Sequence, residues 1–160
     1  MAVDMFMKIA GIKGEARDDK HKDEIDVLAW SWGVSQAGTM HTGGGGGSGK
    51  ANVQDLSFTK YIDKSSPDLM LSCCSGKHLT DATLVVRKAG DKPLEYLTIA
   101  MKDCLITSLS TGGSGGEDRL TENVTLNFAA VKVRYVEQTK TGAPGATPEV
   151  GWDIAANKKL

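Results

Sequence analysis

The chain has 160 residues and a formal net charge of −1, from 19 lysines and arginines against 20 aspartates and glutamates. This length suits a single domain over residues 1–160, and the neutral balance gives no reason to expect binding to nucleic acid or an anionic membrane. No apolar run approaches the roughly 18 residues of a membrane span, and no cleavable secretion signal is recognisable at the start. Three cysteines, two of them adjacent, do not suggest a disulfide framework, so we expect synthesis in a reducing cytoplasm.

Most segments of the chain predict β-strands. Residues 25–34 alternate between two faces, and Trp30 and Trp32 share one of them with Leu28 and Val34. We expect this face to pack against the core, because each indole buries a large apolar area. Further strands are predicted at residues 5–9, 53–62, 82–87, 94–101, 104–109, 124–136 and 150–154.

One of these segments, residues 124–136, changes its apolar positions from even to odd numbers part-way along. Successive side chains of a strand point to opposite faces, so the change requires an irregularity. We expect a one-residue β-bulge near Ala129 and Ala130, of the kind that barrels use to turn a corner.

One helix is predicted, with Ser66 as its N-cap. Pro67 fits the first helical position, Asp68 complements the positive end of the helix dipole, and Gly76 supplies the C-terminal stop. Together with the strands, this helix indicates an all-β fold, either a barrel or a sandwich, with a single short α-helix.

A glycine-rich loop imitates a phosphate-binding loop. Gly44, Gly49 and Lys50 fit the pattern G-x-x-x-x-G-K-[ST], but the last position is Ala51, which has no hydroxyl to hold magnesium. In that motif the loop leads into a helix whose N-terminus holds the phosphates, whereas the residues that follow here alternate as a strand. We therefore interpret residues 39–50 as a long, projecting β-hairpin arm.

No catalytic, cofactor-binding or metal site is predicted. His21, His41 and His78 stand alone in polar stretches, without a second ligand at metal-binding spacing, and we expect them at the surface. Cys73 and Cys74 lie in the predicted helix, where we expect small apolar residues that pack against the core.

Several segments resemble the haemolysin-coregulated protein (Hcp) family. They are EIDVLAWSWG at 24–33, NVQDLSFTKYIDK at 52–64, SPDLM at 66–70, STGGSGG at 110–116, RLTENVTLNF at 119–128 and GWDI at 151–154. The resemblance covers nearly the whole chain and implies a structural protein, not an enzyme. It implies a β-barrel subunit of two packed sheets with one flanking helix, assembled as a homohexameric ring. Stacked rings form the inner tube of the type VI secretion system.

The resemblance also implies partners and a destination. Besides other copies of itself, the tube contacts a spike protein and a contractile sheath, and it can carry secreted effectors in its lumen. The protein would leave the bacterial cytoplasm for the medium or a target cell, without a cleavable signal peptide, a cofactor or membrane insertion.

Two sets of candidate site residues follow from the resemblance. The arm would reach a neighbouring ring, and its residues are Thr39, Met40, His41, Thr42, Gly43, Gly44, Gly45, Gly46, Gly47, Ser48, Gly49 and Lys50. A lumen wall that tolerates cargo needs small or polar side chains, and the candidates are Ala29, Ser31, Gly33, Ser57 and Thr59. Residues 155–160 match nothing in the family pattern, and their role stays open.

The alternative is a monomeric β-domain that binds a small ligand or a carbohydrate. Trp30, Trp32 and Trp152 could then serve as stacking surfaces. Because Trp30 and Trp32 share a face with Leu28 and Val34, packing in the core is favoured over a stacking surface for a ligand. Mass in solution separates the two hypotheses.

Overall fold

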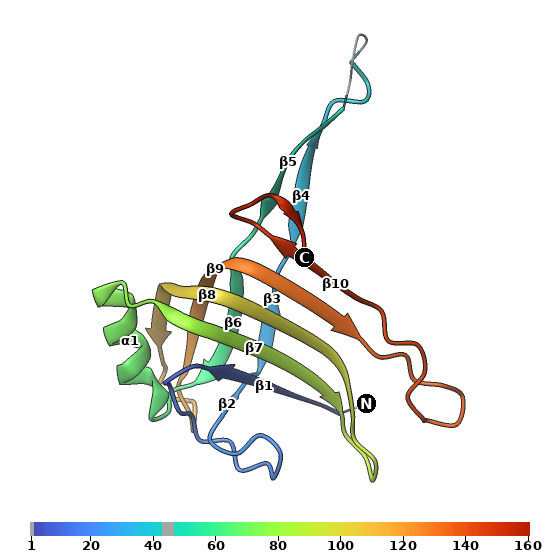
Figure 1. The fold of residues 1–160 in the computed structure, drawn as a ribbon. Helices are drawn as coiled ribbons and strands as arrows, with labels where there is room; N and C mark the ends of the chain where they lie inside the picture. Colours follow the sequence, from blue (N-terminus) through green and yellow to red (C-terminus); the bar gives the residue numbers. More distant parts are fainter. Residues whose placement is uncertain (1, 43–46) are drawn as a thin grey trace.

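The computed structural model describes residues 2–42 and 47–160. Within these residues the chain forms strands and one helix (Figure 1). The elements are β1 (Val3–Ile9), β2 (Ile25–Asp26), β3 (Ala29–Ser31), β4 (Val34–Gly38), β5 (Ser48–Val53), β6 (Leu56–Tyr61), α1 (Ser65–Ser75), β7 (Leu79–Lys88), β8 (Leu94–Gly112), β9 (Thr121–Tyr135), β10 (Glu149–Asp153) and β11 (Lys158–Lys159). In the described part, no helix has the length and apolar character that a membrane crossing requires.

The long strands β8 and β9 belong to two groups of strands at once. Up to Cys104, β8 pairs with β7, and the second half of β9 pairs with β10. The rest of β8 runs beside the first half of β9, which also pairs with β6. One group is therefore β11-β10-β9-β8-β7-β1-β2, and the other is β3-β6-β9-β8.

The predicted all-β class with one short helix is confirmed, but the described strands do not close into a barrel. At the corner between β2 and β3 the chain changes partners. The Val27 N–H donates to the Met5 carbonyl at 2.9 Å, and the next N–H, of Leu28, donates to the Thr59 carbonyl at 2.8 Å. β2 pairs with β1 at one edge of the sheet, and β3 pairs with β6 at the other. These two edges are not paired with each other in the described strands, so the sheet stays open at this corner.

The second corner is a bend that β8 and β9 make together. The change of buried face near Ala129 is confirmed, but the expected one-residue bulge there is wrong, since the register is the same on both sides of it. Asp103 in β8 has a left-handed backbone, with φ of 53°, and the Ala129 carbonyl accepts from the Ile154 N–H at 2.8 Å. The one register shift between these strands lies between Ile106 and Ser108.

The predicted strand over residues 25–34 is broken into β2, β3 and the start of β4. Trp30 and Trp32 pack against the core as predicted. Leu28, at the corner between β2 and β3, is 39% exposed, and Val34, where the chain leaves the body to form the arm, is 55% exposed.

Helix α1 begins at Ser65, one residue before the predicted N-cap, and Ser66 does not cap it. The Ser66 hydroxyl instead accepts from the Asp63 N–H at 3.1 Å and donates to Glu122 Oε1 at 2.6 Å. Gly76 ends the helix with φ of 62°, as predicted, since glycine adopts this conformation without steric cost.

A buried ion pair lies between α1 and the sheet. Lys60 on β6 and Glu122 on β9 are directly opposite each other, are hydrogen-bonded, and are 0% and 1% exposed. Lys60 Nζ also lies 3.1 Å from Asp63 Oδ1 and 3.2 Å from Ser66 Oγ. Because a charge removed from water needs bonded partners, this network holds the start of α1 over the sheet.

Residues 155–160 extend the large sheet, which settles where this tail lies. Lys158 and Lys159 form β11, which pairs with β10, and the Leu160 N–H donates to the Gly151 carbonyl at 3.1 Å.

We predict that Lys60→Met lowers the free energy of unfolding by about 3–5 kcal/mol, because it leaves the Glu122 carboxylate buried without its cation. The double variant Lys60→Met/Glu122→Leu should recover most of this loss, since the buried Glu122 charge is then removed as well and Asp63 keeps the hydrogen bond from the Ser65 N–H at 2.8 Å. Urea unfolding followed by circular dichroism measures both. A single variant as stable as the wild-type chain would contradict this reading of the buried pair.

Candidate functional site

A polar face covers the strands β3, β6, β9 and β8. Cross-strand pairing puts the four predicted residues Ala29, Ser31, Ser57 and Thr59 on it, because directly opposite residues share a face of the sheet. Two rows result, each crossing all four strands. The first is Ala29, Thr59, Asn123 and Ser110, and the second is Ser31, Ser57, Thr125 and Ser108.

Hydrogen bonds between neighbouring strands order this face. Thr59 Oγ1 donates to Asn123 Oδ1 at 2.6 Å, and the Ser57 and Thr125 hydroxyls lie 3.1 Å apart. Both rows consist of alanine, serine, threonine and asparagine. The face therefore offers small, uncharged groups whose polar atoms are partly bonded to one another.

Sequence reasoning missed four residues of these rows: Ser108, Ser110, Asn123 and Thr125. The sequence carries a signal for Asn123 and Thr125. The odd positions from 121 to 127 are all polar, whereas the even positions from 124 to 128 are apolar. Gly33, the fifth predicted residue, lies beyond the end of β3 and outside the rows. Its carbonyl accepts from the Gln54 N–H at 3.0 Å, at the base of the arm.

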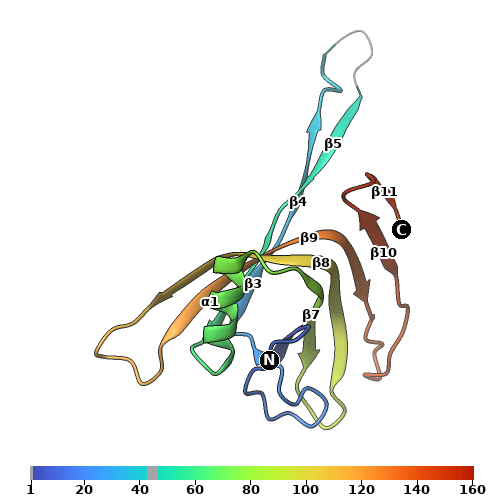
Figure 2. The ribbon, with the colours of Figure 1, turned by 60° about the vertical axis from the view of Figure 1, so that its left-hand side comes forward.

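The polar face ends in two free strand edges. Among the described strands, β3 pairs only with β6, and the part of β8 after Cys104 pairs only with β9. A free edge presents backbone N–H and C=O groups that can pair with another strand. The opposite face of the same strands is buried, with Phe58, Val124 and Leu126 in the core and α1 packed against β8 (Figure 2).

The arm is a two-stranded hairpin of β4 and β5 that projects from the body (Figures 1 and 2). The hairpin over residues 39–50 is thus confirmed in its described part, and it starts earlier, at Val34. Residues 43–46 of the predicted glycine run lie outside the described residues. Gly49 and Lys50 are in strand β5, and the next element is strand β6. The helix that a phosphate-binding loop leads into is therefore missing at this position.

Near its tip the arm is held by Thr39. The Thr39 hydroxyl donates to the Gly47 carbonyl at 3.0 Å, and the Thr42 hydroxyl donates to the Thr39 carbonyl at 2.7 Å. Met40 is 81% exposed, and all of β4 is exposed. Lys50 is the arm's one charged side chain between residues 34 and 53.

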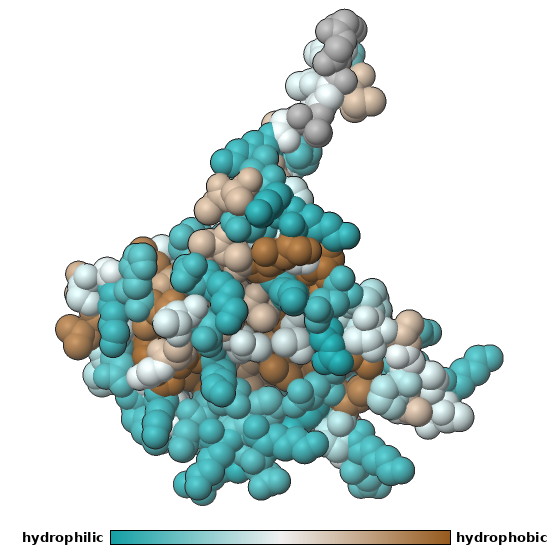
Figure 3. Space-filling model, viewed as in Figure 1, coloured by the Kyte–Doolittle hydropathy of each residue, from teal (hydrophilic) through white to brown (hydrophobic). Residues whose placement is uncertain are grey.

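An apolar hollow of about 310 Å³ opens at the base of the arm. Figure 3 shows hydrophobic side chains gathered there, directly below the arm. The lining residues are Trp32, Val34, Ala51, Val53, Val131, Val133, Val150, Gly151 and Trp152. Val34 and Val150, from β4 and β10, are 55% and 58% exposed.

Comparison with known proteins identifies the family. A sequence model of the family described as "Type VI secretion system effector, Hcp" matches residues 6–135. The chain belongs to the Hcp family. This membership makes it a type VI secretion protein with a structural role and not an enzyme.

Relatives of this Hcp-family chain match it over almost its full length. Protein hcp1 of Pseudomonas aeruginosa is 64% identical over 159 residues, which cover 98% of each chain. The crystal structure of Hcp1 from Salmonella typhimurium is 46% identical, covers 100% of both chains and has a TM-score of 0.84. The crystal structure of a type VI secretion system effector from Yersinia pestis is 40% identical, covers 94% of this chain and 100% of that one, and has a TM-score of 0.78.

The tryptophans of this Hcp-family chain do not support a carbohydrate platform. Trp30, Trp32 and Trp152 all pack against the core cluster, and Trp32 and Trp152 also line the apolar hollow. The Trp32 indole N–H donates to the Gln54 carbonyl at 2.9 Å, which ties the side chain to the base of the arm.

One histidine and one cysteine differ from expectation. His21 is not a surface residue but is 7% exposed, because it packs on Phe6 and bonds to two glutamates. Cys73 packs against the core as predicted, whereas Cys74 is exposed on the outer side of α1. Burial raises the pKa of the Cys104 thiol to about 11, which disfavours the thiolate. In the described residues, no group of three or more His, Cys, Asp or Glu side chains is arranged so that it could hold a metal ion.

Proposed function

We propose that the chain is the ring-forming subunit of a type VI secretion tube. The observation that carries this proposal is the pair of free edges that bounds the polar face. A ring needs a contact between two different surfaces of each subunit, and β3 and the second half of β8 are two such surfaces. Pairing β3 of one copy with β8 of the next continues the sheet around the ring. The number of six subunits rests on the family alone.

In such a ring the polar face lines the lumen. Ala29, Ser31, Ser57 and Thr59 then contribute to the inner wall, with Gly33 near its margin. Helix α1 lies against the other face of these strands and therefore points outward. Small, uncharged side chains hold no cargo rigidly, which suits a wall that meets different effectors.

The arm serves contact between stacked rings. Its strands leave the body and are exposed along β4, so nothing in the described subunit accounts for their length. Residues 39–50 reach the neighbouring ring, where Met40 and His41 contact it while the glycines let the backbone conform. The apolar hollow at the arm's base adds a surface that a second protein chain can cover.

The remaining partners follow from the family. A spike protein caps the tube, a contractile sheath expels it, and effectors travel in the lumen. The protein is made in the bacterial cytoplasm and leaves through this apparatus for the medium or a target cell.

The mass of the protein in solution tests the proposal. Size exclusion with light scattering should give a particle of six subunits, and negative-stain microscopy should show rings. A monomer at every concentration would overturn the proposal and favour the monomeric ligand-binding domain.

Deletion of residues 43–47 should impair stacking more than folding. The shortened arm loses reach, whereas the fold of the body does not depend on it. Electron microscopy measures tube length, and thermal unfolding measures the fold. Met40→Ser should weaken stacking in the same direction. Met70→Ser is its matched control, because Met70 is also exposed, at 57%, but lies on α1. Tubes of normal length after the deletion would remove the arm from the stacking contact.

Ser31→Trp should reduce cargo retention without dissociating the ring. Every subunit then places a bulky ring in the lumen, so a loss of about tenfold or more in effector co-purification is expected. Ser75→Trp is the control, because Ser75 is an exposed residue at the end of α1, outside the ring. Unchanged co-purification would take Ser31 off the lumen wall.

A further inference from the structure

His21 is bonded on both of its ring nitrogens to carboxylates. Nδ1 lies 2.9 Å from Glu24 Oε2, and Nε2 lies 2.6 Å from Glu95 Oε1. The side chain is 8% exposed. A neutral imidazole donates from one nitrogen only, and both nitrogens donate in the imidazolium alone. Both bonds therefore form together only when the ring carries its second proton.

The bond to Glu95 joins the segment of residues 10–24 to the body, and the bond to Glu24 fixes the ring within the segment. Glu24 lies at the end of this segment, and Glu95 lies at the start of β8, so His21 links the two. The ring also stacks on Phe6 of β1, with centroids 4.4 Å apart and planes 12° apart. A cation over an aromatic face is attracted to it, so Phe6 also favours the protonated ring.

The other charged groups around His21 balance in favour of a cation. Asp4 on β1 and Asp18 in the segment both bond to Arg87 on β7, whose guanidinium lies 5.2 Å from the Phe6 centroid. With Glu24 and Glu95, four carboxylates face two cations, and loss of the His21 proton leaves Arg87 as the one cation among them. The Arg87 bond lowers the pKa of Asp18 to about 2, so this second anchor of the segment keeps its charge near neutral pH.

The segment is folded tightly between these anchors. The Ala16 N–H donates to the Glu24 carbonyl at 3.0 Å, and the Asp23 N–H donates to the Ala16 carbonyl at 2.9 Å. Asp23 has a left-handed backbone, with φ of 63°, which is costly for a residue other than glycine. A β-carbon at Gly14 would collide with the Glu24 carbonyl, so the backbones are already in close contact. Such a turn needs bonds at both ends to keep its shape.

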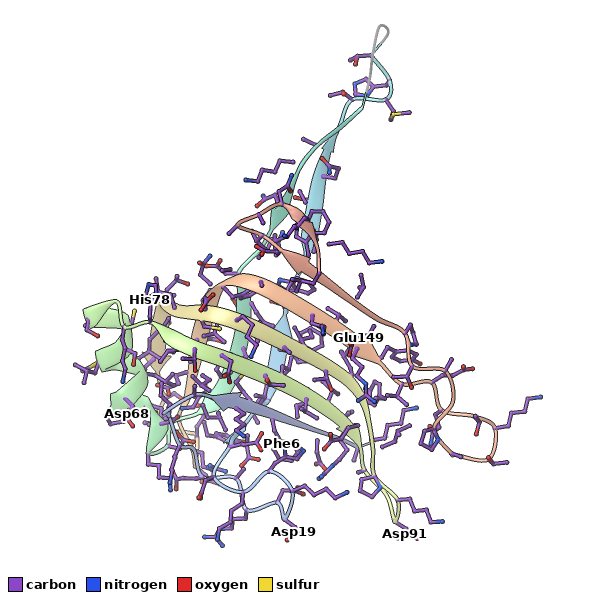
Figure 4. The ribbon with its side chains drawn as sticks, in the orientation of Figure 1. Phe6, Asp19, Asp68, His78, Asp91 and Glu149 are labelled. Carbon is purple, nitrogen blue, oxygen red and sulfur yellow. The ribbon has the colours of Figure 1, made fainter. Side chains whose placement is uncertain are left out.

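We propose that His21 is a protonation-dependent latch that fixes the segment of residues 10–24 against β1 and the β7–β8 hairpin. The shape of this part of the surface then depends on pH. Asp19, near the middle of the segment, lies at the end of the molecule opposite the arm (Figure 4). Both bonds are complete only while the ring carries its second proton and the glutamates are ionised, and one of them is lost when the ring gives up that proton.

Hydrogen exchange tests the latch. Histidine exchanges this proton between about pH 5 and 8, so protection of the Ala16 and Asp23 amides, corrected for intrinsic exchange, is measured across that range. We expect it to fall about tenfold as the pH rises, the effect of one lost charged hydrogen bond. Unchanged protection in the wild-type chain overturns the proposal.

Glu95→Gln is the decisive variant. The amide can turn its NH₂ toward a neutral ring, so both nitrogens stay bonded without the second proton and the pH dependence should disappear. His78→Gln, at an exposed histidine, should keep the wild-type dependence. A Glu95→Gln chain with the wild-type dependence overturns the proposal.

A measurement on the unmodified protein tests the latch without depending on the folding of a variant. The ¹⁵N shifts of the His21 ring report how many of its nitrogens carry protons. Loss of the second proton should follow the same pH course as loss of amide protection in residues 10–24. If the His21 proton and the amide protection are lost over different pH ranges, the latch is contradicted. Whether the protein forms rings does not affect this outcome.

Discussion

The pairing of β8 with β9 is the constraint on which the rest of the structure depends. Both strands change their buried face at the same level, where Asp103 takes a left-handed backbone and the Ala129 carbonyl accepts from the Ile154 N–H, just after β10. Met101 and Val131 are buried on one side of this bend, and Ile106 and Leu126 on the other. A single pair of strands therefore supports both groups of the fold, and an apolar core forms between them.

The pairing of β6 with β9 explains how a buried ion pair and a polar face occur in one strand. Successive side chains of β6 point to opposite faces, so Lys60 turns inward to Glu122 while Thr59 turns outward to Asn123. The inner network anchors α1, and the outer rows stay uncharged. A slip of one residue in this register would exchange the two faces and leave the charged pair in the lumen wall of the proposed ring.

The candidate site was predictable where it depended on alternation within one strand. Ala29 and Ser31, and Ser57 and Thr59, each differ by two positions, which puts each pair on one face of a strand. That the two pairs are neighbours, and that Asn123 and Ser110 complete a row with them, depends on the register between strands. Register joins residues far apart in the chain, and no local pattern specifies it.

The sequence by itself determined the all-β class, the helix with its stop at Gly76, the strand that follows the glycine run and the family, because each rests on local spacing and residue type. Only the tertiary structure decided the open corner at Val27, the shared bend at Asp103 and the burial of His21 between Glu24 and Glu95. The His21–Glu95 bond spans 74 positions of the chain. The physical reason is the same in each case: a charge or a backbone group takes its partner from another strand, and the fold brings the two together.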